Sequence, residues 1–172
     1  MNPLVRFISL LSLPLVASAH AFAAPTTIED TQDVDHVMHA FHEAVVHHDG
    51  ERLSALFLPQ ANLFLNVLGD DRWAAARAKS PDALKVRVSS PAEFAHYVTT
   101  TKSALDPVHS HLQVLSDGII ATVYFDFVFN TDGRPGNVGN ETWQLVKGEQ
   151  GWRIAALTYS SRIPGSQRTS SP

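Results

Sequence analysis

Every second side chain between residues 118 and 130 is apolar or small, and this alternation constrains the fold more than any other feature of the chain. Side chains two residues apart lie on the same face of a strand, so the segment is predicted to be a strand with one buried face. The face expected to be buried carries Ile119, Ala121, Val123, Phe125, Phe127 and Phe129. Asp126 falls on the opposite face, which argues against a role as a catalytic acid in the core.

Three further strands are predicted around this segment, at residues 110–115, 140–147 and 151–161. Turn sequences such as Asp117-Gly118 and Asp132-Gly133 join neighbouring strands, and connections this short predict antiparallel pairing. Residues 133–139 are expected to form a hairpin loop, because their glycine spacing does not fit a dinucleotide-binding loop.

Helical spacing replaces alternation near the N-terminal end. Apolar residues recur every three or four positions from Val34 to Val45, so a long helix is predicted there, ending near Asp49-Gly50. A short second helix is expected to follow and to end at Pro59, since proline cannot continue a helix.

A strand at residues 61–68 and a further helix are predicted before the C-terminal strands. The sequence Ser90-Pro91-Ala92-Glu93 is typical of a helix start, with serine as the cap and glutamate closing a capping box. The polar residues 69–88 are expected to form a long loop, with or without a short helix. Helices followed by an antiparallel sheet indicate the α+β class.

The first residues differ from the rest of the chain. Arg6 is the only charged residue before Thr27, and residues 4–16 are mostly apolar. Small residues follow, and their alanine-rich sequence matches the pattern at which signal peptides are cleaved. This arrangement predicts a secretory signal peptide at residues 1–24, a domain at 25–163 and a polar disordered tail at 164–172. The protein is therefore expected to be periplasmic or secreted, and without cysteine it forms no disulfide.

The remaining composition excludes several classes of function. The net charge is −4 and no run of basic residues occurs, which argues against nucleic acid as a partner. No later segment is long and apolar enough to span a membrane. The chain has no cysteine nucleophile and no serine-nucleophile elbow, and no cofactor or metal site is predicted.

The order of the elements, together with two local patterns, resembles the nuclear transport factor 2-like (SnoaL-like) superfamily. The first pattern is His48-Asp49-Gly50 followed by Leu53, Leu56 and Phe57. The second is the closing hairpin, from Glu141-Thr142-Trp143 through Gly151-Trp152 to Tyr159-Ser160-Ser161. The resemblance covers about residues 30–163 and implies a curved sheet wrapped around the helices, forming a cone with an internal pocket. It implies no single activity, because the superfamily contains isomerases, dehydratases, cyclases, epoxide hydrolases and non-catalytic binding proteins.

An aromatic set is expected to line this pocket and to bind a small hydrophobic molecule: Phe41, Phe125, Phe127, Trp143 and Tyr159. Glu141 shares a strand face with Trp143, so it is a candidate catalytic acid whose pKa burial would raise. The alternative is that Glu141 is solvated or paired with Arg153. Compared with ketosteroid isomerases, Phe41 and Leu65 fall where those enzymes have a tyrosine and a general base, so that proton shuttle is not expected.

Several histidines are candidates for metal ligands or general bases. His36, His39 and His42 are spaced by three, which spreads them around a helix instead of gathering them on one face. His109 and His111 alternate along a strand and are expected to project on one side. A metal would need a third ligand, for which His96 is a candidate.

Three functions remain open. The protein is expected to bind a small hydrophobic molecule without turning it over. Alternatively, it is an isomerase- or dehydratase-like enzyme that uses Glu141 with a histidine or Tyr159. The third possibility is a dimeric interaction module, in which Thr122, Tyr124 and Thr142 on the outer sheet face contact a second copy.

Overall fold

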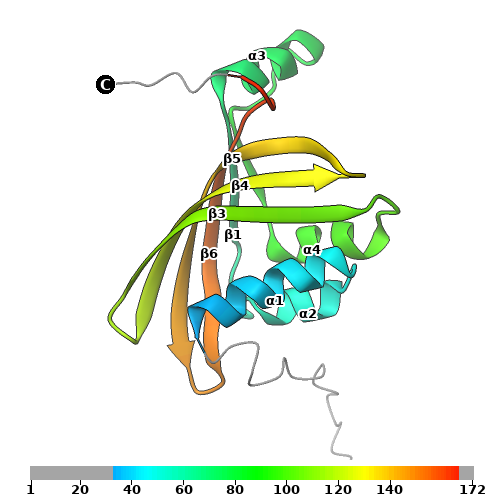
Figure 1. Cartoon of the computed structure of the whole chain (residues 1–172). Coiled ribbons are helices and arrows are strands. Elements are labelled where there is room, and N and C mark those ends of the chain that lie inside the picture. The colour runs from blue at the N-terminus through cyan, green and yellow to red at the C-terminus, as the bar shows by residue number, and fades with distance from the viewer. Residues whose placement is uncertain (1–32, 167–172) are drawn as a thin grey trace, which may run out of the picture.

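The computed structural model describes residues 33–166, which form one curved sheet with three of the four helices on its inner side (Figure 1). The helices are α1 (Val34–Val46), α2 (Gly50–Ala55), α3 (Asp70–Lys79) and α4 (Pro91–Thr100). The strands are β1 (Leu63–Leu68), β2 (Val86–Ser89), β3 (Leu105–Ser116), β4 (Ile120–Thr131), β5 (Arg134–Gly148) and β6 (Gly151–Ser161). The predicted signal peptide (1–24) and most of the predicted tail (164–172) lie outside the described residues.

The sheet order is β2-β1-β6-β5-β4-β3. All neighbours are antiparallel except β1 and β6, which are parallel. The α+β class and the antiparallel meander at the C-terminal end are therefore confirmed. The parallel pairing of β1 with β6 joins the strands from the N-terminal half of the chain to the C-terminal meander.

α1 forms where the spacing of apolar residues predicted it, and its inner side is buried. The Asp33 side chain begins the helix by accepting a hydrogen bond from the backbone N–H of His36 at 2.8 Å. The turn after α1 is made by His47 and His48, and His48 has a left-handed φ of 58°. The backbone N–H of Asp49 closes this turn by donating to the carbonyl oxygen of Ala44 at 2.8 Å, and its side chain caps α2 by accepting from the N–H of Arg52 at 2.9 Å.

α2 lies against α4 because its first residue is glycine. A Cβ at Gly50 would overlap the Thr99 hydroxyl and lie 2.5 Å from the carbonyl oxygen of Ala95. α4 itself begins at the predicted capping box, where the Glu93 N–H donates to Ser90 Oγ at 3.1 Å. Figure 1 shows α1, α2 and α4 gathered under the curved strands.

Residues 69–88 contain a full helix and a strand, which is more regular structure than expected. α3 has no buried residue, and it is held by Arg72, whose guanidinium donates to the carbonyl oxygens of Gly136 and Arg162 at 2.8 and 2.9 Å. In Figure 1 this helix lies at the end of the molecule away from α1. β2 is an edge strand with three of its four residues exposed. Its four residues alternate between apolar and polar side chains, but the run is short and was not predicted as a strand.

β4 carries the predicted buried face, with Ala121, Val123, Phe125 and Phe127 all buried. Ile119 was predicted to share this buried face, but it precedes the strand and is 67% exposed. The prediction of a hairpin loop at residues 133–139 is also wrong. Residues 134–139 are the first part of β5 and pair with β4, while the turn is confined to Asp132 and Gly133, whose φ values are 52° and 72°.

A bulge in β6 changes which side chains face the core. Gln144 pairs with Ala156 whereas Leu145 pairs with Ile154, so one extra residue is inserted in β6. Ile154 and Leu157 are consequently both buried although they are three residues apart. Strict alternation through residues 151–161, as read from the sequence, is therefore wrong.

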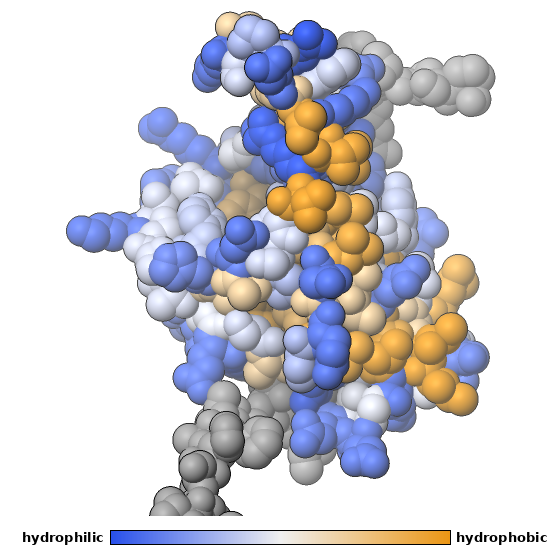
Figure 2. Space-filling model, turned by 180° about the vertical axis from the view of Figure 1, so that it is seen from behind, coloured by the Kyte–Doolittle hydropathy of each residue, from blue (hydrophilic) through white to orange (hydrophobic). Residues whose placement is uncertain are grey.

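Large apolar side chains also remain on the surface. Those with the highest exposure include Leu115, Ile119 and Ile120 around the β3–β4 hairpin, Val88 in β2 and Leu84 just before it. Figure 2 shows hydrophobic side chains gathered in a band on one side of the molecule. No helix within residues 33–166 is long and apolar enough to cross a membrane.

Candidate functional site

A pocket of about 250 Å³ lies between the inner face of the sheet and helices α1 and α4. Every layer of the fold contributes to its wall, because the sheet curves around the helices. The lining residues are Phe41, Phe64, Phe94, Tyr97, Pro107, His109, Phe127, Phe129, Asn137, Glu141 and Tyr159. No lysine or arginine is among them, so the pocket is aromatic with a few polar groups that carry no positive charge at neutral pH.

The structure divides the five aromatic residues predicted to bind a ligand into two layers. Phe41, Phe127 and Tyr159 line the pocket. Phe125 and Trp143 are fully buried behind that wall, where their rings meet edge to face with centroids 5.4 Å apart. These two residues support the pocket from below and lie outside the surface that a ligand would touch.

Glu141 is the one buried carboxyl at this pocket. It is 8% exposed, and its Oε1 accepts a hydrogen bond from Trp143 Nε1 at 2.5 Å. Burial raises the pKa of Glu141 to about 7, and the indole hydrogen bond opposes that rise only in part. The alternative pairing with Arg153 is wrong, because Arg153 lies opposite Val146 in the sheet whereas Glu141 lies opposite Tyr159.

His109 and Tyr159 are the other titratable groups whose pKa values the pocket shifts. Burial lowers the pKa of His109 to about 4, aided by repulsion from His42 and opposed by Asp106. Burial, and then the charge of Glu141, raise the pKa of Tyr159 to about 12. At pH 7 the imidazole and the phenol are both uncharged, so these two groups can form hydrogen bonds with a ligand without contributing an ion.

His109 and His111 do not project on one side, contrary to the expectation from alternation. The β3–β4 register shifts between Ser110 and Gln113, and His111 has a left-handed φ of 53°. His109 therefore lines the pocket, while His111 Nδ1 lies 3.0 Å from Asp126 Oδ2 on the outer face of the sheet.

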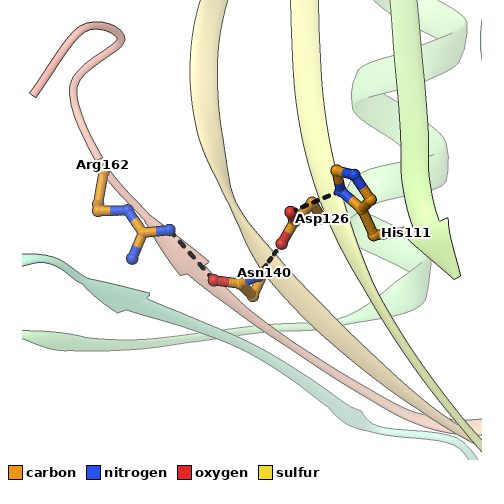
Figure 3. A network of polar contacts seen from close by, with 4 residues as sticks. All are labelled: His111, Asp126, Asn140 and Arg162. Atoms are coloured by element: carbon orange, nitrogen blue, oxygen red, sulfur yellow. Dashed lines mark hydrogen bonds and ion pairs between the residues drawn. The ribbon is translucent and has the colours of Figure 1, made fainter. Parts of the chain in front are cut away.

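This outer pair belongs to a chain of polar contacts across neighbouring strands (Figure 3). Asn140 Nδ2 donates to Asp126 Oδ1, and Arg162 Nη2 donates to Asn140 Oδ1 at 3.1 Å. The outward direction predicted for Asp126 is thus confirmed. Across residues 33–166, no three histidine, aspartate or glutamate side chains are grouped to hold a metal ion.

Several pocket residues were not among the predicted ligand-binding set: Phe64, Phe94, Tyr97, Pro107, His109, Phe129 and Asn137. Helical spacing in α4 and alternation in β4 could have added Phe94, Tyr97 and Phe129. Phe64 and Asn137 reach the pocket through the β1–β6 pairing and the early start of β5, and no local pattern signals either.

No protein-family model and no curated protein matches the sequence. Solved structures do match. A nuclear transport factor 2-like protein with a cystatin-like fold from Novosphingobium aromaticivorans is 14% identical, with a TM-score of 0.53 over 76% of this chain and 79% of that chain. A candidate dehydratase of the same family from Streptomyces avermitilis is 19% identical, with a TM-score of 0.52 over 78% of this chain and 96% of that chain.

A candidate scytalone dehydratase, also from Novosphingobium aromaticivorans, is 12% identical, with a TM-score of 0.54 over 81% of this chain and 89% of that chain. At such low identity the likeness concerns the fold alone. The chain has the cystatin-like fold of nuclear transport factor 2-like proteins, which confirms the resemblance drawn from its sequence.

Proposed function

We propose that this protein binds a small, mostly apolar and uncharged molecule in its internal pocket, with Glu141 and Tyr159 as polar anchors. The observation that carries the proposal is an aromatic pocket that holds a buried carboxyl and no cationic side chain. Pockets of this composition, with a few polar groups that orient the ligand, are typical of small-molecule sites. A ligand anion would face Glu141 without a compensating positive charge.

The size of the pocket limits the ligand. An apolar cavity of about 150 Å³ holds benzene, and drug-sized molecules occupy pockets of about 300–1,000 Å³. A pocket of about 250 Å³ therefore fits a molecule of one or two rings. Near pH 7 Glu141 exists in both protonation states, so it can donate a hydrogen bond to a ligand carbonyl or accept one from a ligand hydroxyl.

Calorimetric titration with two bicyclic probes tests this proposal. We expect 2-naphthol, which is neutral, to bind, and 2-naphthoate, which is an anion of similar shape, to bind at least tenfold more weakly. Tyr159→Phe should weaken 2-naphthol binding about 3- to 10-fold, the value of one hydrogen bond. Tyr124→Phe, on the exposed outer face, is the matched control and should change nothing. Equal binding of both probes, or an equal effect of both substitutions, would count against the proposed site.

A second candidate is acid–base catalysis of the isomerase or dehydratase kind. It is favoured by one observation: Glu141, with a pKa of about 7, and the unprotonated His109 line the same pocket. The probe is 2-tetralone, a neutral ketone with exchangeable protons beside its carbonyl. In D₂O, mass spectrometry should show deuterium uptake that is lost in Glu141→Gln while binding remains. Uptake at the wild-type rate in that variant would remove Glu141 from the chemistry.

Export is a further part of the proposal. It is supported by the apolar segment and the alanine-rich cleavage patterns within residues 1–24. The intact mass of the protein recovered from the periplasmic or secreted fraction should lack these residues. Recovery of the full-length mass inside the cell alone would overturn it.

We also propose that the protein self-associates through the outer face of its sheet. Thr122 and Tyr124 are exposed on that face, and Thr142 is half-buried beside them. Light scattering should then give a dimeric mass that Tyr124→Lys converts to a monomer. A monomeric wild-type protein at high concentration would exclude this partner.

A further inference from the structure

The carboxyl group of Glu141 has two oxygens in different surroundings. Oε1 accepts from the Trp143 indole N–H at 2.5 Å, and Trp143 is fully buried behind the pocket wall. Glu141 nevertheless lines the pocket, so Oε2 is the oxygen left for a bound molecule. Because an indole N–H can only donate, Oε1 must act as an acceptor in either protonation state of the carboxyl.

The indole is held in place by aromatic rings on three other elements. Its ring centroid lies 4.8 Å from Phe41 on α1, 5.4 Å from Phe125 on β4 and 6.1 Å from His109 on β3. These contacts fix the direction in which the N–H points, as close packing in a core requires. Glu141 and Trp143 are two residues apart on β5, so both side chains project to the inner side of the sheet.

The other titratable groups at the pocket approach Glu141 from separate elements. They are Tyr159 on β6, opposite Glu141 in the sheet, His109 on β3 and Tyr97 on α4. α1, β1 and β4 contribute only phenylalanine to the lining. Asp106 and His42 act on His109. None of the lining groups is a cation that could replace the indole as a partner of the carboxylate.

We propose that Trp143 is a positioning residue that directs the acidic proton of Glu141 to Oε2, the oxygen available to a ligand. The inference rests on the proposed binding function. Without the indole N–H, the proton can reside on either oxygen and the carboxylate loses a buried hydrogen-bond donor. The pocket would then present a less directed donor and would ionise less readily.

Carbon NMR of glutamate-labelled protein without ligand tests this inference directly. The Cδ resonance of Glu141 is identified by its loss in Glu141→Gln. Trp143→Phe keeps an apolar ring but removes the N–H, and should move the pH midpoint of Glu141 upward by about one pH unit, the effect of a hydrogen bond to a charged group. Trp152→Phe, at a buried tryptophan on the neighbouring strand, is the matched control and should leave the midpoint in place. An unchanged midpoint in folded Trp143→Phe would overturn the proposal.

A measurement on the wild-type protein covers the case in which Trp143→Phe does not fold. The Nε1–H proton resonance of Trp143 should titrate with the same midpoint as the Cδ resonance of Glu141, because the two groups share a hydrogen bond. An indole resonance that is constant across this interval would overturn the proposal.

Binding of 2-acetylnaphthalene, a neutral probe that can only accept a hydrogen bond, separates this inference from the proposed function. At pH 6 we expect Trp143→Phe to weaken its binding about 3- to 10-fold. If the wild-type protein binds no neutral bicyclic probe, the proposed function fails while the NMR titrations still decide the role of Trp143. If the probe binds equally well to both proteins, the positioning role fails and the binding function stands.

Discussion

His109 and Glu141 both contact the indole of Trp143, and burial shifts their pKa values in opposite directions. The pKa of the carboxyl rises to about 7 and that of the imidazole falls to about 4. A buried site disfavours the charged form of each group, which is the anion of the acid and the cation of the base. Both groups are therefore mostly uncharged between about pH 4 and 7, and they oppose each other in the pH dependence of stability.

Glu141→Gln isolates the contribution of the carboxyl. The folded protein binds the Glu141 proton more tightly than the unfolded chain does, so this group removes stability as the pH rises from about 4.5 to 7. The free energy of unfolding of the wild type relative to Glu141→Gln should fall by about 3 kcal/mol over that interval. Urea unfolding at several pH values measures the difference, and a constant difference would contradict the raised pKa.

His109→Phe isolates the imidazole, since phenylalanine fits the aromatic surroundings and does not titrate. The folded protein binds the His109 proton more weakly than the unfolded chain does, so this group adds stability as the pH rises from about 4 to 6.5. The free energy of unfolding of the wild type relative to His109→Phe should therefore increase through that interval. The double variant with Glu141→Gln should show neither trend, which makes it the control for both measurements.

Local patterns predicted those parts of the fold that local physics determines. Ser90 caps α4 as expected, with its Oγ accepting from the backbone N–H of Glu93 at 3.1 Å. The alternation in β4 identified its buried face, and the same rule placed Glu141 with Trp143 on the inner side of β5. In each case the decisive interactions lie within a few residues of one another along the chain.

Long-range pairing and irregular backbone escaped prediction for the opposite reason. β2 is formed by pairing with β1, and the two valines on one of its faces stay exposed and do not pack into the core. The parallel contact of β1 with β6 joins segments about ninety residues apart. Bulges in β3 and β6 change which side chains face the core, because each bulge inserts one extra residue into the strand. The alternation of apolar residues in the sequence does not reveal such an insertion. His109 precedes the bulge and shares the inner face with Leu105 and Pro107, whereas His111 lies within the bulge and faces outward. The separation of the two histidines therefore follows from the tertiary structure alone.

The left-handed conformation of His111 has a measurable cost. Its φ of 53° disfavours residues with a Cβ, and its ring interacts with Asp126 at 3.0 Å. Glycine and alanine both remove that interaction, but glycine adopts this φ without strain. His111→Gly should therefore be about 1 kcal/mol more stable than His111→Ala in thermal or urea unfolding. Equal stability of the two variants would show that the loop relaxes to another conformation.

Gly139 allows β5 and β6 to approach each other beside the pocket. A Cβ at this position would overlap the carbonyl oxygen of Ser160 and lie 2.9 Å from the ring of Phe127. Because the nearest obstacle is backbone, we expect Gly139→Ala to lower the free energy of unfolding by about 2 kcal/mol or more and to weaken probe binding through Phe127.

The control for Gly139→Ala lies three residues earlier on the same strand. A Cβ at Gly136 would meet its nearest atoms at 3.5 Å, an ordinary contact distance. Gly136→Ala should therefore change the free energy of unfolding by less than about 1 kcal/mol, with a small gain expected because alanine restricts the unfolded chain. If the two alanine variants unfold at the same urea concentration, the close approach of the strands at Gly139 does not contribute to the free energy of unfolding.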